Sequence, residues 1–188
     1  MSDSAEVESR LIGQWPTGSP SWHDARASRI GGSEISAILG VSPYESPFGL
    51  WLRKRGSIGG QEVNDQMTVG TYVEDAVCRW WLDTCGASAT LVDGGTYVHP
   101  ERTWQLANPD RLVYGPGRKV SVLEAKFQIF ADGWGPDGSD EVPPYYLAQC
   151  RWYLDVLDLD VAHVAVLFGQ EGRFGRYTIR SDREDAEL

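Results

Sequence analysis

The alternation of two long helix-like segments with short strand-like segments, five between the helices and two after the second, constrains the fold of this chain more than any other feature. Residues 67–85 and residues 145–157 carry apolar side chains at helical spacing. The strand-like segments are residues 90–92, 96–99, 104–108, 111–114, 120–126, 161–168 and 175–179. This order predicts an α/β (α+β) fold in which helices flank a mixed central β-sheet.

Three shorter helices are expected before these segments, where good capping residues precede apolar runs. They are residues 21–26, 34–39 and 48–55. Ser33 is expected to cap the second of these helices. Ser46, followed by Pro47, is expected to begin the third.

The charge distribution suggests one domain with polar ends. Residues 1–20 have the composition of a loosely ordered lead-in, residues 21–181 form a single domain, and residues 182–188 form an acidic tail. The net charge of -10, from 17 Lys and Arg against 27 Asp and Glu, at first argues against a nucleic-acid partner. Seven of those acids lie in residues 1–9 and 182–188, so the total charge is a weak argument.

The cysteines and the apolar segments bear on location. Cys78, Cys85 and Cys150 lack the close spacing of a metal site. An odd number of cysteines, in a chain that begins without a secretory signal, predicts reduced thiols in the cytoplasm. No apolar stretch is long enough to span a membrane.

Acidic and basic side chains are expected to meet on two neighbouring strands. Strand side chains alternate between faces, so Glu124 and Lys126 share one face, and Asp110 begins the neighbouring strand. Two carboxylates and an ammonium are costly to bury together without a purpose. A divalent metal ion between Asp110 and Glu124 would relieve their repulsion, and Mg²⁺ favours such ligands together with water and phosphate. A surface salt bridge on a strand pair is the alternative interpretation.

The two long helices carry further polar candidates. Glu74 lies beside the apolar stripe of residues 67–85, where it could face a site. Gln149 and Tyr153 are four residues apart and therefore share one face of their helix. A glutamine amide can bind a phosphate, a base edge or a lysine. An ordinary surface glutamine is the alternative.

Residues 29–44 (RIGGSEISAILGVSPY), followed by Ser46-Pro47 and Leu50-Trp51, are the most specific segment. This segment resembles the opening motif of the YqaJ-type viral recombinases, the lambda exonuclease-like branch of the PD-(D/E)XK nucleases. That branch has, in order, a GxS–helix motif, a GxxxE helix, PD, ExK and a QxxxY helix. This chain shows all five in that order, and the resemblance implies a PD-(D/E)XK restriction-endonuclease-like fold.

The resemblance also implies the metal ligands. Asp110 and Glu124 would ligate the metal, with the main-chain carbonyl of Ala125 as a further ligand. Glu74 would act near a second ion or through water. Two Mg²⁺ ions per active site are implied, and Mn²⁺ is expected to substitute.

Lys126 and Gln149 complete the catalytic set that the resemblance implies. The reaction is metal-assisted phosphodiester hydrolysis, in which Lys126 assists the attacking water. Gln149 would support the site.

A phosphate site is implied near the start of the domain. Lambda exonuclease-like enzymes hold a terminal 5′-phosphate with an Arg and a Ser seven residues apart, and Arg26 and Ser33 have that spacing. A guanidinium binds phosphate through two hydrogen bonds, and a helix N-terminus offers free N–H groups. Arg29 is the competing candidate. A helix-capping role of Ser33 is compatible with phosphate binding.

Further candidates for DNA contact lie on a helix end, in a loop and on the second long helix. They are Arg53, Lys54, Arg55, Trp134 and Tyr153. A solvated helix end is the alternative for the three basic residues. Trp134, in a loop rich in glycine, could stack on a base or wedge a duplex end. His99 could be an extra metal ligand, but a histidine at a strand end more often has a structural role.

The resemblance implies an exonuclease that degrades one strand 5′→3′ from a double-stranded DNA end. Such enzymes act with a single-strand annealing protein in phage-type homologous recombination. A trimeric ring is implied by lambda exonuclease, although a monomer or another assembly remains open. The alternatives are a PD-(D/E)XK endonuclease and a catalytically silent module that binds DNA ends or a protein.

Overall fold

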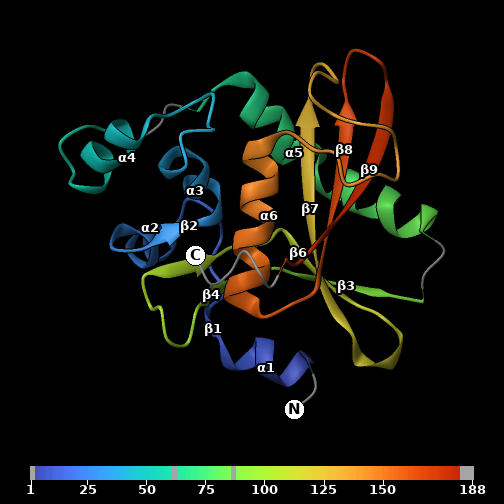
Figure 1. Ribbon diagram of the computed structural model, residues 1–188, viewed down its shortest axis with the longest axis horizontal. Coiled ribbons are helices and arrows are strands. Elements are labelled where there is room, and N and C mark those ends of the chain that lie inside the picture. The colour runs from blue at the N-terminus through green and yellow to red at the C-terminus, as the bar shows by residue number, and fades with distance from the viewer. Residues whose placement is uncertain (1–2, 61–62, 86–87, 183–188) are drawn as a thin grey trace.

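A five-stranded mixed sheet forms the centre of the computed structural model, which describes residues 3–60, 63–85 and 88–182 (Figure 1). Its strands, in spatial order, are β3 (Thr90–Asp93), β6 (Arg111–Tyr114), β7 (Val120–Gln128), β8 (Val161–Phe168) and β9 (Arg173–Arg180). β7 and β8 run parallel, and the other neighbours are antiparallel. The 3-10 turn η1 (Pro116–Arg118) joins β6 to β7 in the expected hairpin. The predicted mixed central sheet is confirmed.

The two long helices, α5 (Asp65–Thr84) and α6 (Pro144–Leu157), cover opposite faces of this sheet (Figure 1). Alternating strand residues serve the two faces. Leu123 of β7 packs with Val77 and Trp81 of α5, whereas Val122 packs in the cluster that includes α6. Glu124, two residues after Val122, therefore points toward α6. A strand buried on both faces fixes the orientation of its polar side chains.

A smaller sheet has the order β1 (Leu11–Gly13), β4 (Thr96–Val98), β5 (Gln105–Ala107) and β2 (Ile30–Gly31). Helix α6 joins the two sheets, since Trp152 Nε1 donates to the Leu106 carbonyl at 3.0 Å. Because α6 also packs against the larger sheet, this hydrogen bond helps to hold the two sheets together as one folded unit.

The start of the chain is more regular than the expected loose lead-in. Residues 3–13 contain helix α1 (Asp3–Ser9) and strand β1. Val7 is buried, and Arg10 donates to the carbonyl of Val156 at 2.7 Å, so this segment is held against the end of α6. All but Asp182 of the predicted acidic tail lies outside the described residues.

Three short helices follow: α2 (Pro20–Ala27), α3 (Gly32–Ile38) and α4 (Pro47–Lys54). Ser46 caps α4 as expected. The predicted capping role of Ser33 is wrong, because Gly31 is the N-cap of α3 and its N–H donates to Glu34 Oε2 at 2.8 Å. No helix in the described part of the chain is long and apolar enough to cross a membrane.

Candidate active site

The PD and ExK segments meet where β6 begins. Arg111 pairs with Leu123 in the antiparallel register, which sets Asp110 across from the ExK segment. Asp110 Oδ2 accepts a hydrogen bond from the Ala125 N–H at 2.8 Å. The predicted pairing of these two segments therefore follows from the register of one hairpin.

Glu124 is buried, with 2% of its surface exposed. Its Oε1 atom accepts from Lys126 Nζ at 2.6 Å and from Gln149 Nε2 at 2.5 Å. Its Oε2 atom is buried and, among the described residues, has no hydrogen-bond partner. Leaving a buried carboxylate oxygen without a partner is costly, so this atom is placed to receive a ligand.

The pKa values show an excess of negative charge. Burial and the adjacent Glu124 carboxylate raise the pKa of Asp110 to about 7. Burial, followed by the charge of Asp110, raises the pKa of Glu74. Burial alone would lower the pKa of Lys126, but Glu124 and Asp110 raise it well above its usual range. A bound cation would stabilise the carboxylates of Asp110 and Glu124.

Asp110 and Glu124 fit a divalent ion by their chemistry. Both supply the hard oxygen ligands that Mg²⁺ prefers, and the unpartnered Oε2 of Glu124 marks where one is needed. Within residues 3–60, 63–85 and 88–182, no three His, Cys, Asp or Glu side chains form a ready metal cluster. Main-chain oxygens such as that of Ala125, together with water, would complete the ligand set.

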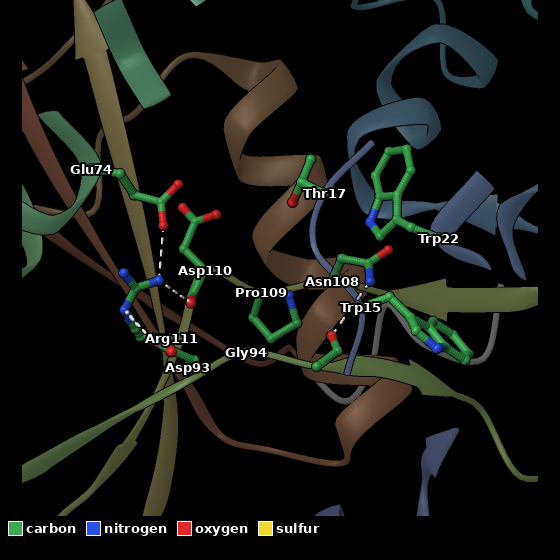
Figure 2. A pocket seen from close by; sticks show the side chains of 11 residues that line it. Trp15, Thr17, Trp22, Glu74, Asp93, Gly94, Asn108, Pro109, Asp110 and Arg111 are labelled. Carbon is green, nitrogen blue, oxygen red and sulfur yellow. Dashed lines mark hydrogen bonds and ion pairs between the residues drawn. The ribbon is translucent and has the colours of Figure 1, made fainter. Parts of the chain in front are cut away.

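Glu74 lies at the edge of this site, in a hollow of about 120 Å³ (Figure 2). The hollow is lined by Trp15, Thr17, Trp22, Glu74, Asp93, Gly94, Gly95, Asn108, Pro109, Asp110 and Arg111. Arg111 Nη1 donates to Glu74 Oε1 at 2.8 Å and to the Asp110 carbonyl at 2.7 Å. Glu74 therefore faces the site as expected, but an arginine that sequence reasoning missed binds it.

Gln149 and Tyr153 connect Glu124 to the PD segment. Gln149 Nε2 also donates to Tyr153 Oη at 2.9 Å, and Tyr153 Oη donates to the Asn108 carbonyl at 2.9 Å. Tyr153 is buried, and its ring lies so close to Gly32 that a Cβ atom on residue 32 would be 2.3 Å from a carbon of the ring. This buried position differs from the expected DNA contact of Tyr153 and gives the side chain a positioning role.

Arg26 and Ser33, the predicted phosphate pair, lie together. Arg26 Nη2 donates to Ser33 Oγ at 3.2 Å, and Nη1 donates to Asn108 Oδ1 at 3.0 Å. The guanidinium lies 4.5 Å from the ring centre of Trp22, which supports it by a cation–π contact. Asn108 is two residues before Asp110, so it joins the pair to the PD segment.

Arg29, the competing candidate for the phosphate site, binds main-chain carbonyls instead. Its guanidinium donates to the main-chain carbonyls of Ala25 at 2.9 Å and Thr103 at 3.1 Å. These bonds anchor α2 to the loop before β5. The structure brings Arg26, and not Arg29, to Ser33.

A buried carboxylate that sequence reasoning missed, Glu34, organises the basic residues of α4. Lys54 Nζ lies 2.8 Å from Glu34 Oε2 and donates to the carbonyls of Arg26 and Arg29. Arg53 binds Glu34 Oε1 at 3.1 Å and also pairs with Glu45. The expected DNA contacts of Arg53 and Lys54 therefore need correction, because both side chains are occupied within the protein.

The remaining candidates lie outside this cluster. Arg55 is exposed, with its guanidinium 4.9 Å from the ring centre of Trp51. Trp134 is half-buried and packs against the rings of Tyr146 and Tyr177, which differs from the expected stacking on a base or at a duplex end. The ring stays with the core because burying a tryptophan is strongly favourable.

His99 has a structural environment. It is 8% exposed, and its Nδ1 atom accepts from the N–H groups of Glu101 and Arg102 at 3.1 and 2.9 Å. Burial and the charge of Arg102 lower its pKa. These hydrogen bonds to Nδ1 stabilise the turn after β4. His99 is therefore not placed beside Asp110 and Glu124 as the extra metal ligand that the sequence allowed.

The chain is similar in sequence to one described domain family and to a curated protein. A family model described as the YqaJ-like viral recombinase domain matches residues 21–160. The uncharacterized protein YqaJ of Bacillus subtilis (strain 168) is 32% identical over 151 residues, covering 79% of this chain and 46% of that protein. The chain thus spans about half the length of this curated relative.

Solved structures share the fold. The alkaline exonuclease LHK-Exo from Laribacter hongkongensis has a TM-score of 0.66 and 19% identity, covering 90% of this chain and 87% of that chain. Its complex with dAMP also gives a TM-score of 0.66, at 17% identity. A phage related exonuclease from Haemophilus somnus 129PT has a TM-score of 0.60 and 16% identity, covering 84% and 87%. These similarities confirm the predicted PD-(D/E)XK-like fold, and the family match over most of the chain shows that it belongs to the YqaJ-like viral recombinase domain family.

Proposed function

We propose that this chain is a metal-dependent deoxyribonuclease that degrades linear double-stranded DNA from its ends. The observation that carries the proposal is the buried Glu124, with one oxygen held by Lys126 and Gln149 and the other without a partner among the described residues. This arrangement, beside the half-buried Asp110, suits metal-assisted hydrolysis of a phosphodiester. The similar solved structures described above, which are those of exonucleases, support the same class.

Asp110, Glu124 and the Ala125 carbonyl would hold the ion, Mg²⁺ or Mn²⁺. When bound, such an ion supplies Lewis acidity toward the scissile phosphate. Lys126, whose ammonium already lies in the site, would orient the attacking water or stabilise negative charge on the phosphate. Gln149 keeps Glu124 in place by its hydrogen bond to Oε1.

Arg26 and Ser33 would hold the terminal 5′-phosphate and so give the enzyme its 5′→3′ direction. Their side chains are in contact, and Asn108 links Arg26 to the segment that contains Asp110. A phosphate held there would lie beside the hollow that Trp22 and Asp110 line. The proposed biological setting is end resection before annealing by a partner single-strand annealing protein.

The test is digestion of linear duplex carrying either a 5′ or a 3′ label, with Mg²⁺ and with EDTA. We expect mononucleotides from the 5′ label first, and no product with EDTA. Cutting of a covalently closed plasmid would favour an endonuclease. DNA binding without any product, at adequate metal concentration, would favour a silent binding module.

The phosphate pair has its own test. Duplex with a 5′-phosphate should be degraded faster than duplex with a 5′-hydroxyl, and Ser33→Ala and Arg26→Ala should reduce that preference. Arg55→Ala is the matched control, since Arg55 is exposed and lies on another helix end. Equal rates on the two duplexes with the wild-type protein would contradict the assignment. Light scattering in the same preparations would report whether a trimer forms.

A further inference from the structure

Arg111 makes an unusual set of contacts beside the proposed catalytic site. Its guanidinium binds Glu74 at 2.8 Å, the carbonyl of Asp110 at 2.7 Å and Asp93 at 3.1 Å (Figure 2). It also binds Asp75. The Arg111 side chain is 13% exposed. The five donors of a guanidinium lie in one plane, so these contacts fix its position at the mouth of the hollow.

The fold leaves this arginine few alternatives. Arg111 is the first residue of β6 and pairs directly with Asp93 of β3. Glu74 and Asp75 approach from α5, which covers this face of the sheet. The guanidinium is therefore enclosed between a sheet edge and a helix, and it cannot leave without releasing all of its acidic partners.

Glu124 and Glu74, the two carboxylates nearest to Asp110 in this site, differ in whether their oxygens already have a partner. Glu124 has a buried oxygen without a partner in the part of the chain that the structure describes. Glu74 has a cation in place already, because Arg111 binds its Oε1 atom. A divalent ion ligated by Glu74 would lie close to this fixed positive charge and would be repelled by it.

We propose that Arg111 is a positioning residue that takes the place of a second cation beside Glu74, so that the site loads one divalent ion, on Asp110 and Glu124. The inference rests on the proposed metal-dependent function and corrects its expected two-ion form. Arg111 holds Glu74 and, through the Asp110 carbonyl, the main chain that carries the metal-binding carboxylate. Its charge is permanent, so Glu74 keeps this cationic partner at any metal concentration.

The stoichiometry of Mn²⁺ binding tests this inference, measured by calorimetry on the full chain without DNA. We expect one ion per wild-type chain. Arg111→Gln should expose Glu74 and bind two, whereas Arg111→Lys, which keeps the charge, should bind one. Arg79→Gln is the matched control, because Arg79 is exposed on the helix that carries Glu74. In the double variant Arg111→Gln, Glu74→Gln the count should return to one.

Two ions in the wild type, or one ion in folded Arg111→Gln, would overturn the inference while leaving the metal-dependent function intact. No ion in the wild type would overturn both. If circular dichroism shows that Arg111→Gln does not fold, Glu74→Gln in the wild-type background decides. The inference requires one ion with an affinity within about threefold of wild type. A tenfold or greater loss would make Glu74 a ligand and overturn it.

Discussion

Two buried glutamates, Glu34 and Glu124, are equally hidden from solvent but differ in how well they are satisfied. Glu34 is 4% exposed and Glu124 is 2% exposed. Both oxygens of Glu34 are paired: Oε1 with Arg53, and Oε2 with the N–H of Gly31 and the ammonium of Lys54. Glu124 has one oxygen with two donors and one with none among the described residues. A satisfied buried charge builds structure, whereas an unsatisfied one needs a ligand.

The pKa values distinguish the region around Glu34, the satisfied region, from the region around Asp110 and Glu124, the unsatisfied region. Burial alone would raise the pKa of Glu34, but Arg26, Lys54 and the Gly31 N–H lower it overall. In the other region, burial and Glu124 raise the pKa of Asp110 to about 7. The first region is stabilised by its ionised carboxylate, and the second is destabilised until a cation arrives.

The largest expected effect comes from removing the ammonium of the unsatisfied region. Lys126→Ala should lower the nuclease rate about 10³-fold, in the range of general acid–base catalysis, because no other ammonium contacts Glu124 in the described structure. The measurement is the initial rate on linear duplex with Mg²⁺. Lys119→Ala, at an exposed position before β7, is the matched control. Activity of folded Lys126→Ala within a few-fold of wild type would remove Lys126 from the catalytic set.

The same substitution in both regions tests the comparison directly. Glu34→Gln should lower the free energy of unfolding by about 3 kcal/mol, because it leaves Arg53 and Lys54 without their shared buried partner. Glu124→Gln, measured in EDTA, should cost only about 1 kcal/mol, because the loss of the ion pair with Lys126 is offset in part by removal of the charge that repels Asp110 and of the unpartnered Oε2. Urea denaturation at pH 7 gives both values. Equal losses of unfolding free energy would show that the two glutamates contribute equally to stability.

Sequence patterns predicted the parts of the site that depend on local geometry. The alternation along β7 sets Glu124 and Lys126 on one face, and one hairpin register brings Asp110 to them. The side chains of Arg26 and Ser33, seven residues apart, meet because α2 and α3 are joined by a short connection. In each case the distance along the chain is small, or a single strand pairing closes it.

The features that the sequence did not predict depend on contacts between distant segments. Arg111 binds residues 36 and 37 positions earlier on α5, which no local pattern encodes. The sequence predicted DNA contacts for Arg53 and Lys54, with a solvated helix end as the alternative, and gave no sign that both side chains pair with the buried Glu34. Trp134 lies in a loop rich in glycine, and only the packed core shows what its ring contacts.

The ionisation of Asp110 gives a pH-dependent test of the unsatisfied region. Its pKa rises from an ordinary value of 3.8 to about 7 in the folded protein, so its contribution to stability is full below about pH 4 and is lost as the pH rises through 7. In EDTA, Asp110→Asn should therefore be more stable than wild type by on the order of 2 kcal/mol at pH 8, after a discount for relaxation, and by less at pH 5. Urea denaturation at both pH values measures this difference.

Two conditions serve as controls for that experiment. Saturating Mg²⁺ should abolish the advantage at pH 8, because the ion stabilises only the wild-type carboxylate. Asp132→Asn, at an exposed loop position, should show no pH-dependent gain. A wild-type protein that is the more stable one at pH 8 in EDTA would show that Asp110 is satisfied within the protein, as Glu34 is.

The smallest expected effect concerns the side chain that lies between the two regions. Tyr153 contacts Gly32 at the start of α3, accepts from Gln149 and donates to the carbonyl of Asn108. Tyr153→Phe should cost about 1 kcal/mol of unfolding free energy, the usual value of one buried hydrogen bond, and lower the nuclease rate by less than about tenfold because Gln149 still holds Glu124. Tyr177→Phe is the matched control, since that buried hydroxyl donates to the Gly135 carbonyl at 3.0 Å, away from the site. Equal stability losses with a rate change only at Tyr153 would mean that the satisfied region also positions the unsatisfied one, whereas unchanged rates in both variants would show that the two regions work independently.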